Sequence, residues 1–439
     1  MVDIDSYRLS DRWTEDDGTV FMTGIQALAR LPIEQLRVDR EAGLDTAAFV
    51  TGYPGSPLGG FDGAIASAVG YAPDLPIIAR PALNEEHAAT AVMGSQLAAS
   101  RPDARYAGVV GLWYGKAPGV DRASDAIRHA VFAGSDPNGG AVLLVGDDPG
   151  AKSSTIPSSS AGSLADMHIP VLYPGNPAEA LDLGRHAIAM SRATGLWTSV
   201  KLVADVADGS GTVDLDPHRV VPRIPLLEGV AYHHSPDGNL LTPHTVDIEQ
   251  EIYEVRHPLA VEYASLNGLN RATVDPADAW IGIVASGITY SEVREAFRRL
   301  GLTTDHEIAD TGIRILKLGM PMPFNPATVR HFVRGLEQVL VIEEKHPNVE
   351  SRLKEALYND SHHPLVIGKR DEAGDRLFGG HGALTADLII PVLRSRLEGR
   401  IGDRLAPAVE PRQRIPLTVD RAPYFCSGCP HNRSTVVPD

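Results

Sequence analysis

The sequence predicts an α/β protein with two doubly wound, mostly parallel sheets. Short, continuously apolar segments alternate with helical patterns over residues 47–203, and a second series of the same kind covers residues 280–397. Strands that are apolar on both faces are typical of parallel sheets covered by helices. The sequence shows neither a solenoid-type repeat nor a heptad run, and 439 residues leave room for about three domains.

The first series is expected to form the first sheet. We expect its strands at residues 47–50, 76–79, 108–113, 141–145, 171–173 and 199–203, and its helices at residues 61–69, 85–100, 121–132 and 177–192. Pro, His and Asp then interrupt the pattern from about Asp214 to Asp278, as in a linker or a covering segment.

The second series is expected to form the second sheet, with strands at 280–284, 313–316 and 339–343 and a helix at 349–358. Thr289 and Glu292 match a capping box for a helix that ends at Leu300. Asn325 and Pro326 are typical of the N-cap and first residue of a helix, expected to end at Leu336. We therefore expect domains at 1–215 and 276–405, a linker or covering segment at 216–275, and the start of a further domain at 406–439.

Composition excludes several classes of protein. There are 56 acidic and 40 basic residues, a net charge of −16, so binding to nucleic acid or to anionic membranes is not expected as the main role. No apolar stretch is long enough for a transmembrane helix, and the acidic N-terminus does not match a secretory signal. With only two cysteines the chain is not a disulfide-rich secreted protein, and a cytoplasmic location is expected.

A glycine-rich turn, Thr51 to Gly60, follows the first predicted strand. Ligands of open α/β sheets bind at the carboxyl ends of strands, and glycines allow a close approach of the backbone. Ser56 has a hydroxyl that is able to donate a hydrogen bond to a substrate carboxylate. An ordinary strand-to-helix loop explains the same pattern.

Asn84-Glu85-Glu86-His87 opens the next helical pattern. Asn84 suits an N-cap, and acidic residues in a first turn complement the helix dipole, which accounts for both glutamates structurally. The functional interpretation is a carboxyl group at the mouth of the sheet that shares a proton with a heterocycle.

Other polar clusters receive structural interpretations. The pair Asp147-Asp148 suggests magnesium, but a hydrated turn is preferred because no third oxygen ligand is spaced to match. The serine-rich stretch 153–163 resembles a mobile lid or loop. The adjacent histidines at 233–234 and 362–363 are expected to be exposed to solvent.

Cys426 and Cys429 form one C-x-x-C within a proline-rich tail. Pro430 breaks the haem-attachment pattern, and neither a zinc site nor a cluster is complete with two thiolates. The spacing suits a cluster or a zinc knuckle that continues beyond the last residue.

Five motifs in order carry a family resemblance: Tyr53-Pro54-Gly55-Ser56-Pro57, Asn84-Glu85, the segment 116–125, Asp147-Asp148-Pro149-Gly150, and Cys426-x-x-Cys429-Pro430-His431. This series resembles the indolepyruvate:ferredoxin oxidoreductases, which are thiamine-diphosphate-dependent 2-oxoacid:ferredoxin oxidoreductases. It is most similar to the N-terminal part of the fused form. The resemblance implies a pyrimidine-binding domain at 1–215, a transketolase C-terminal-like domain at 276–405 and the start of a diphosphate-binding domain at 406–439, so the chain is expected to be incomplete alone.

The resemblance also implies an activity and its site. It implies oxidative decarboxylation of indolepyruvate or related aryl 2-oxo acids to acyl-coenzyme A, with electrons passed to ferredoxin or another carrier. Thiamine diphosphate, Mg²⁺ and a [4Fe-4S] cluster would be the cofactors, and the protein would be at least a homodimer. Glu85 matches the catalytic carboxyl, and Ser56 and Gly55 match substrate-binding positions. Matches to cofactor-binding positions are Tyr53, Pro54, Asn84 and Lys116, and Cys426 and Cys429 match cluster ligands.

Departures from the family pattern leave alternatives. Glu86 stands where separate-subunit relatives often have Lys, and the substrate arginine of the pyruvate-type enzymes has no clear match near Asp148. Phenylpyruvate-like and branched-chain 2-oxo acids therefore stay open as substrates. A non-redox thiamine-diphosphate decarboxylase or transferase is one alternative, and a non-catalytic chain that docks with a partner is another.

Overall fold

The computed structural model describes residues 7–361, 363–408 and 431–437. The chain divides into two compact units, Met1–Leu405 and Ala406–Asp439, and the second contains the short helix α17 (His431–Ser434). Both sheets lie in the first unit, and the expected domain boundaries within it stay a prediction. Among the described residues, no helix is both long and apolar enough to cross a membrane.

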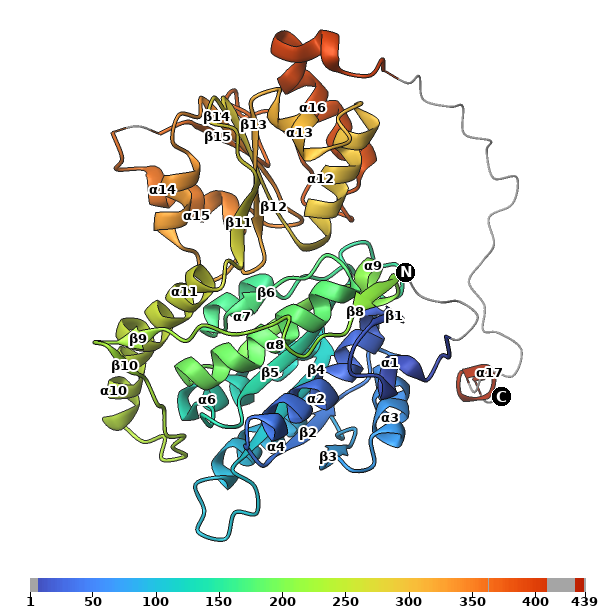
Figure 1. Ribbon diagram of the computed structural model, residues 1–439, viewed down its shortest axis with the longest axis vertical. Helices are drawn as coiled ribbons and strands as arrows, with labels where there is room; N and C mark the ends of the chain where they lie inside the picture. Colours follow the sequence, from blue (N-terminus) through green and yellow to red (C-terminus); the bar gives the residue numbers. More distant parts are fainter. Residues whose placement is uncertain (1–6, 362, 409–430, 438–439) are drawn as a thin grey trace. The chain divides into compact units, whose positions relative to one another are not determined.

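The first sheet is fully parallel, which confirms the predicted fold class (Figure 1). Four of its strands are continuously buried or nearly so, as the apolar runs predict. Its six strands lie in the spatial order β3 (Ile77–Ala79), β2 (Thr46–Gly52), β4 (Gly108–Lys116), β5 (Ala141–Asp147), β7 (Thr198–Val203) and β6 (Val171–Leu172).

Helices cover this sheet in two groups. Right-handed crossovers place α3 and α8 on one face and α4 and α6 on the other. The contacts agree with this arrangement, because α2 packs against α3 and α8, and α4 packs against α6. The bounds are α2 (Gly24–Glu41), α3 (Phe61–Tyr71), α4 (Glu85–Ala98), α6 (Ser124–Ala133) and α8 (Pro177–Thr194).

The N-terminal region contains helices and a strand that the sequence patterns did not predict. Helix α1 (Asp11–Thr14) precedes β1 (Thr19–Thr23), which pairs antiparallel with β8 (Ser210–Asp214). Helix α2 follows directly and has Pro32 within it. The single helix expected at residues 121–132 is instead two helices, α5 (Ala117–Arg122) and α6. The helical conformation starts earlier than predicted because Pro118 is tolerated in a first turn, and it breaks at Ala123.

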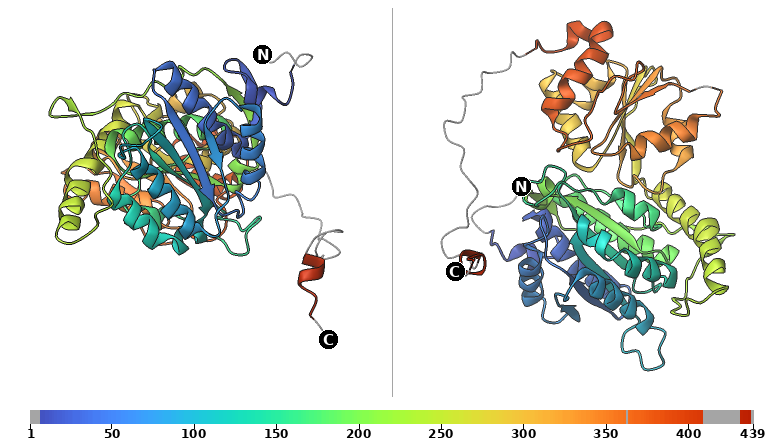
Figure 2. Two further views of the ribbon diagram at one scale, coloured as in Figure 1. Left: turned by 90° about the horizontal axis from the view of Figure 1, so that it is seen from below. Right: turned by 180° about the vertical axis from the view of Figure 1, so that it is seen from behind.

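The second sheet has one antiparallel edge strand on an otherwise parallel sheet. Separate apolar cores lie on its two faces, one under α12 and α16 and the other under α14 and α15. The right view of Figure 2 shows helices on both sides of this sheet. The strands are, in spatial order, β11 (Asn270–Val274), β13 (Ile313–Leu318), β12 (Ile281–Ser286), β14 (Gln338–Ile342) and β15 (Leu365–Ile367). The helices are α12 (Gly287–Arg299), α13 (Asp305–Ala309), α14 (Pro326–Phe332), α15 (Asn348–Leu357) and α16 (Ala386–Ile401), followed by the 3₁₀ turn η2 (Gly402–Arg404).

The segment 216–275 is more structured than a linker. It contains a two-stranded hairpin, a π-helical turn between two helices, and β11 at its end, which joins the second sheet. Helix α11 packs against α8 of the first sheet. The bounds are β9 (Leu226–Leu227), β10 (Val230–Ala231), α10 (His244–Glu251), η1 (Ile252–Arg256) and α11 (His257–Leu266).

One predicted helix cap is wrong and another is confirmed. The capping box of α12 is formed by Ser286 and Thr289, not by Thr289 and Glu292. The Glu292 carboxylate instead accepts a hydrogen bond from the Ala386 N–H at 2.6 Å, at the start of α16. Asn325 caps α14 as predicted, accepting from the N–H groups of residues 327 and 328, but the helix ends at Phe332 and not at Leu336.

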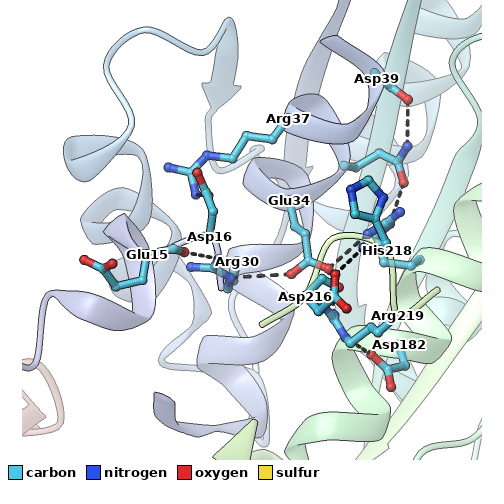
Figure 3. A network of polar contacts seen from close by, with 12 residues as sticks. Glu15, Asp16, Arg30, Glu34, Arg37, Asp39, Asp182, Asp216, His218 and Arg219 are labelled. Carbon is cyan, nitrogen blue, oxygen red and sulfur yellow. Dashed lines mark hydrogen bonds and ion pairs between the residues drawn. The ribbon is translucent and has the colours of Figure 1, made fainter. Parts of the chain in front are cut away.

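A buried cluster of charged side chains joins α2 to α8 (Figure 3). Glu34 accepts a hydrogen bond from Arg185 at 3.0 Å and pairs with Arg219 at 2.6 Å and with Arg30 at 3.5 Å. Burial lowers the pKa of Arg30 to about 10, although the charge of Glu34 opposes this shift. Burial also acts to lower the pKa of Arg219, but Glu34 and Asp182 outweigh it and the pKa is raised. Glu34 is therefore the common partner of three guanidinium groups, and Asp182 also pairs with Arg219 at 2.6 Å.

We predict that Glu34→Ala lowers the free energy of unfolding by about 3–5 kcal/mol, because it leaves three buried or half-buried cations without their common partner. The matched control is Glu41→Ala, at the exposed end of the same helix, where the described part of the chain shows no ion pair. That change should cost about 0.5 kcal/mol or less. Chemical denaturation measures both, and equal midpoints for the two variants would contradict the assignment.

Candidate active site

The carboxyl ends of the first sheet's strands bring four loops to one edge. Because β2, β4, β5 and β7 are parallel, the segments after residues 52, 116, 147 and 203 all start from the same side of the sheet. Three of the sequence-predicted motifs lie on these loops, and Glu85 opens the helix that follows β3. This edge is where open α/β sheets bind ligands.

The glycine-rich turn after β2 contacts two of the other loops. A Cβ at Gly55 would lie 3.0 Å from Cδ of Lys116, so the glycine lets the lysine stem pass close to the turn. The Ser56 hydroxyl donates to the hydroxyl of Ser153 at 2.5 Å, and Ser154 Oγ donates to the Ser56 carbonyl at 3.0 Å. The structure therefore joins Gly55 to Lys116 and Ser56 to the serine-rich loop.

Tyr53 and Pro54 are exposed at the start of the same turn. The Tyr53 N–H donates to the Tyr114 carbonyl at 3.1 Å, which continues the pairing of β2 with β4 for one residue. The phenol ring of Tyr53 is 43% exposed and is free to meet a ligand or another chain.

Asn84 and Glu85 hold different positions although they are neighbours. The Asn84 side chain caps α4 by accepting from the His87 N–H at 2.8 Å, as predicted. Glu85 is buried, whereas Glu86 is exposed. The two acidic residues of this first turn are therefore not equivalent, and only Glu85 is enclosed by protein.

Three residues around Glu85 were not predicted as site residues. The Trp113 indole Nε1–H donates to the Glu85 carbonyl at 3.0 Å, and Arg122 Nε lies 3.9 Å from a Glu85 carboxylate oxygen. A Cβ at Gly119 would lie 2.8 Å from Glu85 Cγ and 2.9 Å from Oε1. Within the described residues the Glu85 carboxylate accepts no hydrogen bond, and no contact joins it to Ser56. The signal for Gly119 is a glycine directly after Pro118 in a first turn.

The pair Asp147-Asp148 is buried, so the expected hydrated turn is wrong. Burial acts to raise the pKa of Asp148, but the N–H groups of residues 152, 153 and 154 donate to its carboxylate and hold the pKa below the usual value. Asp147 accepts from the Ser160 N–H at 3.1 Å and lies 3.4 Å from Lys201 Nζ. The serine-rich stretch, expected to be a lid or loop, is thus held near both ends before α7 (Ala161–Asp166) begins.

The second sheet contacts this loop from the other side. Lys345 Nζ donates to the Pro149 carbonyl at 2.5 Å. The Tyr173 hydroxyl donates to Glu344 at 3.2 Å, and the ammonium of Lys201 lies 4.3 Å from the centre of the Tyr173 ring. Burial raises the pKa of Glu344, with Lys201 opposing the shift. Residues of both sheets therefore hold the segment that carries Ser153.

The predictions for the histidine pairs are partly confirmed, and those for the cysteines are not tested by the structure. His234 is buried beside Gly134, contrary to the expectation of exposure, and burial lowers its pKa to about 4. His233 and His363 are exposed as predicted. Residue 362 and the two cysteines lie outside the described residues, and within the described part no cluster of three His, Cys, Asp or Glu is arranged to hold a metal ion.

Comparison with known proteins identifies a matching family model and several relatives. Residues 271–413 match the family model described as indolepyruvate oxidoreductase domain. Indolepyruvate oxidoreductase subunit IorA of Methanothermobacter thermautotrophicus is 26% identical over 413 residues, covering 94% of this chain and 59% of that protein. The same subunit of Archaeoglobus fulgidus is 24% identical over 424 residues, covering 94% and 60%. The chain is therefore similar to indolepyruvate oxidoreductase subunits over most of its length.

A solved structure shares the fold. The 2-oxoglutarate:ferredoxin oxidoreductase from Magnetococcus marinus, with 2-oxoglutarate, coenzyme A and succinyl-CoA bound, matches with a TM-score of 0.62 and 15% sequence identity. The match covers 87% of this chain and 66% of that chain, and it concerns the fold alone. The chain spans 59% of the length of the Methanothermobacter relative.

We predict that Gly119→Ala displaces the Glu85 side chain, because the new methyl group would overlap Cγ and Oε1 while the flexible carboxylate is free to rotate away. A crystal structure of the variant should lack the 3.9 Å approach to Arg122. The control is Gly94→Ala in the interior of α4, where a Cβ meets nothing within 4 Å. It should leave Glu85 in place and stabilise the helix by up to about 1 kcal/mol. An unmoved Glu85 in the Gly119 variant would contradict the close approach.

Proposed function

We propose that this chain supplies the carboxylate side of a thiamine diphosphate site in a 2-oxo acid:ferredoxin oxidoreductase. The proposed reaction is oxidative decarboxylation of indolepyruvate or a related aryl 2-oxo acid to an acyl-coenzyme A, with electrons passed to ferredoxin. The observation that carries the proposal is Glu85, a buried carboxylate at the ligand-binding edge of the sheet that accepts no hydrogen bond from the described residues.

The chemistry of the donor set fits the pyrimidine half of the cofactor. A buried carboxylate that lacks hydrogen bonds has a strong tendency to take a donor, and the pyrimidine ring of the cofactor offers one when a ring nitrogen is protonated. Gly119 lets the backbone of α5 approach Glu85 closely, which limits the positions of the carboxylate. The described residues offer no comparable set of oxygen ligands for Mg²⁺, so we assign this chain only the pyrimidine side.

Thiamine diphosphate supplies a nucleophile and an electron sink for cleavage of the bond between the carboxyl and keto carbons of a 2-oxo acid. The role of Glu85 is to hold a proton at the pyrimidine ring, which a carboxyl group at hydrogen-bond distance performs as general acid and base. The Trp113 indole fixes the backbone at Glu85 through its hydrogen bond to the carbonyl. Arg122 supplies a positive charge near the carboxylate.

The turn after β2 is proposed for the substrate side. Ser56 is proposed to donate to the substrate carboxylate, for which its hydroxyl exchanges the hydrogen bond it now makes to Ser153. Gly55 lies beside Ser56, and because it has no side chain the stem of Lys116 is able to approach the turn closely. Tyr53, Pro54, Asn84 and Lys116 are proposed as cofactor-binding positions, as the family resemblance implies, and a homodimer is proposed because thiamine sites form between domains of different chains.

We predict that Glu85→Gln lowers turnover of indolepyruvate at least about 100-fold, because the amide does not exchange the proton. Glu86→Gln is the matched control, with the same chemical change one residue away on an exposed side chain, and it should retain nearly full turnover. Ferredoxin reduction by the complete protein measures both, and thermal unfolding checks that the variants remain folded. Turnover of the Glu85 variant equal to that of the control would refute the assignment.

Cys426 and Cys429 are proposed as two thiolate ligands of a [4Fe-4S] cluster, on the basis of their spacing and the family resemblance. We predict that Cys426→Ala lowers the iron content of the complete protein and weakens its visible absorption. Ser427→Ala, between the two cysteines, should leave both unchanged. Unaltered iron in the Cys426 variant would exclude this cysteine as a ligand.

A further inference from the structure

A pocket of about 420 Å³ lies where the first sheet's α7–β6 loop meets the π-helical turn and α15. His168 lines it from that loop, Tyr253 from η1, His257 from the start of α11, and Asn348 and Arg352 from α15. None of the residues proposed above for the 2-oxo acid site lines this pocket.

The rings in the pocket form a compact group. The His168 and Tyr253 ring centres are 4.9 Å apart in an edge-to-face arrangement, and His168 and His257 are 5.6 Å apart. His257 Nε2 lies 2.9 Å from the His168 carbonyl oxygen. Since a carbonyl oxygen only accepts, Nε2 carries the hydrogen, and Nδ1 of the neutral ring is left as an acceptor. Within the described residues, Nδ1 of His257 has no hydrogen-bond partner.

Both imidazoles are uncharged at neutral pH. Burial lowers the pKa of His257, and the nearby Arg352 guanidinium lowers it further, while the His168 carbonyl opposes the shift. Burial also lowers the pKa of His168, helped by the charge of Arg128 and opposed by Asp166 and Glu249. The rings are therefore neutral hydrogen-bonding groups in a positive environment.

The pocket has one uncompensated charge, and it is positive. Arg352 is exposed on α15 and makes no ion pair or hydrogen bond with the described residues. Asp166 also lines the pocket, but its carboxylate pairs with Arg128, which holds the pKa of Asp166 below the usual range. A free guanidinium is the side chain best suited to bind two oxygens of an oxyanion at once.

The backbone around the pocket is held in unusual conformations. His168 has a φ of +63°, a left-handed conformation that residues other than glycine rarely adopt. Tyr253 lies in the π-helical turn Ile252–Arg256, a conformation that is rare and frequent at functional sites. Two of the three residues whose rings meet in the pocket therefore lie on uncommon backbone, which supports a functional role.

We propose that this pocket binds hydrogenphosphate, the dianion of inorganic phosphate that keeps one hydroxyl hydrogen. Arg352 would bind two charged oxygens, and Nδ1 of His257 would accept a hydrogen bond from the remaining hydroxyl. Sulfate has the same shape but no hydroxyl hydrogen, and it would place an oxygen against the acceptor nitrogen. The proposal does not depend on the 2-oxo acid reaction, and its test is a direct binding measurement.

The first test compares inorganic phosphate with sulfate by isothermal titration calorimetry on the full chain at about pH 8, where phosphate is mainly a dianion like sulfate. Phosphate should bind at least about tenfold more tightly, the factor expected for one hydrogen bond gained against one acceptor left unmatched. Equal affinities, or no saturable binding of phosphate, would overturn the proposal. Methyl phosphate is a further control, because its dianion has no hydroxyl hydrogen at this pH and should bind no more tightly than sulfate. An affinity for methyl phosphate equal to that for phosphate would contradict the role assigned to the hydroxyl.

The second test locates the binding. Arg352→Gln should weaken phosphate binding at least about tenfold, as expected for loss of a charge-assisted pair of hydrogen bonds. Arg271→Gln on β11 is the matched control, because Arg271 is also exposed and unpaired among the described residues but lies outside the pocket. The affinity of the Arg271→Gln variant for phosphate should stay within about twofold of that of the unsubstituted chain. An unchanged affinity in Arg352→Gln would show that phosphate binds elsewhere and would refute the proposal.

Discussion

The parallel alignment of the first sheet is the constraint on which the candidate site depends. Because every neighbouring pair of its six strands is parallel, the loops after β2, β4 and β5 emerge on one side and contact one another. Close packing makes these contacts specific, since a Cβ at Gly146 would lie 2.9 Å from Pro57 in the turn after β2. Glycine is required at this position because the turn after β2 packs directly against β5.

The second sheet has a role in this arrangement beyond its own core. Lys345, directly after the Glu343-Glu344 pair that follows β14, holds the Pro149 carbonyl, and Glu344 accepts from Tyr173. Asp147 and Lys201 form a buried ion pair at 3.4 Å, and the charge of Lys201 also acts on the half-buried Glu344, opposing the rise of its pKa. The loop that carries Ser153 is therefore held through Asp147 and Asp148 of the first sheet and through Lys345 of the second.

Much of the fold followed from the sequence, and the misses have physical causes. Continuous apolar runs identified most strands of both sheets, because a strand that is buried on both faces has apolar residues at nearly every position. Helix α2 was not assigned, and its interior Pro32 and buried Arg30 and Glu34 hide the apolar periodicity of a typical covering helix. The antiparallel edge strand β11 was hidden because only Val274 of its five residues is buried.

The site was predicted in its parts but not in its contacts. Asn84 was recognisable as a cap from local sequence, and the comparisons agree with the family resemblance. Gly119, Arg122 and Trp113 meet Glu85 only through the tertiary fold, so no local spacing marks them. The burial of Asp147 and Asp148 was missed for the same reason, because their partners at residues 152–160 and 201 are brought to them by the loop and by β7.

The central claim is that Glu85, and not another carboxylate, meets the pyrimidine ring of thiamine diphosphate. The most direct measurement is an experimental structure of the complete protein with the cofactor bound. The account predicts a Glu85 carboxylate oxygen within about 2.6–3.2 Å of a pyrimidine ring nitrogen, with Gly119 still packed against the side chain. A different carboxylate at that nitrogen, or a cofactor bound away from the carboxyl edge of the first sheet, would contradict it.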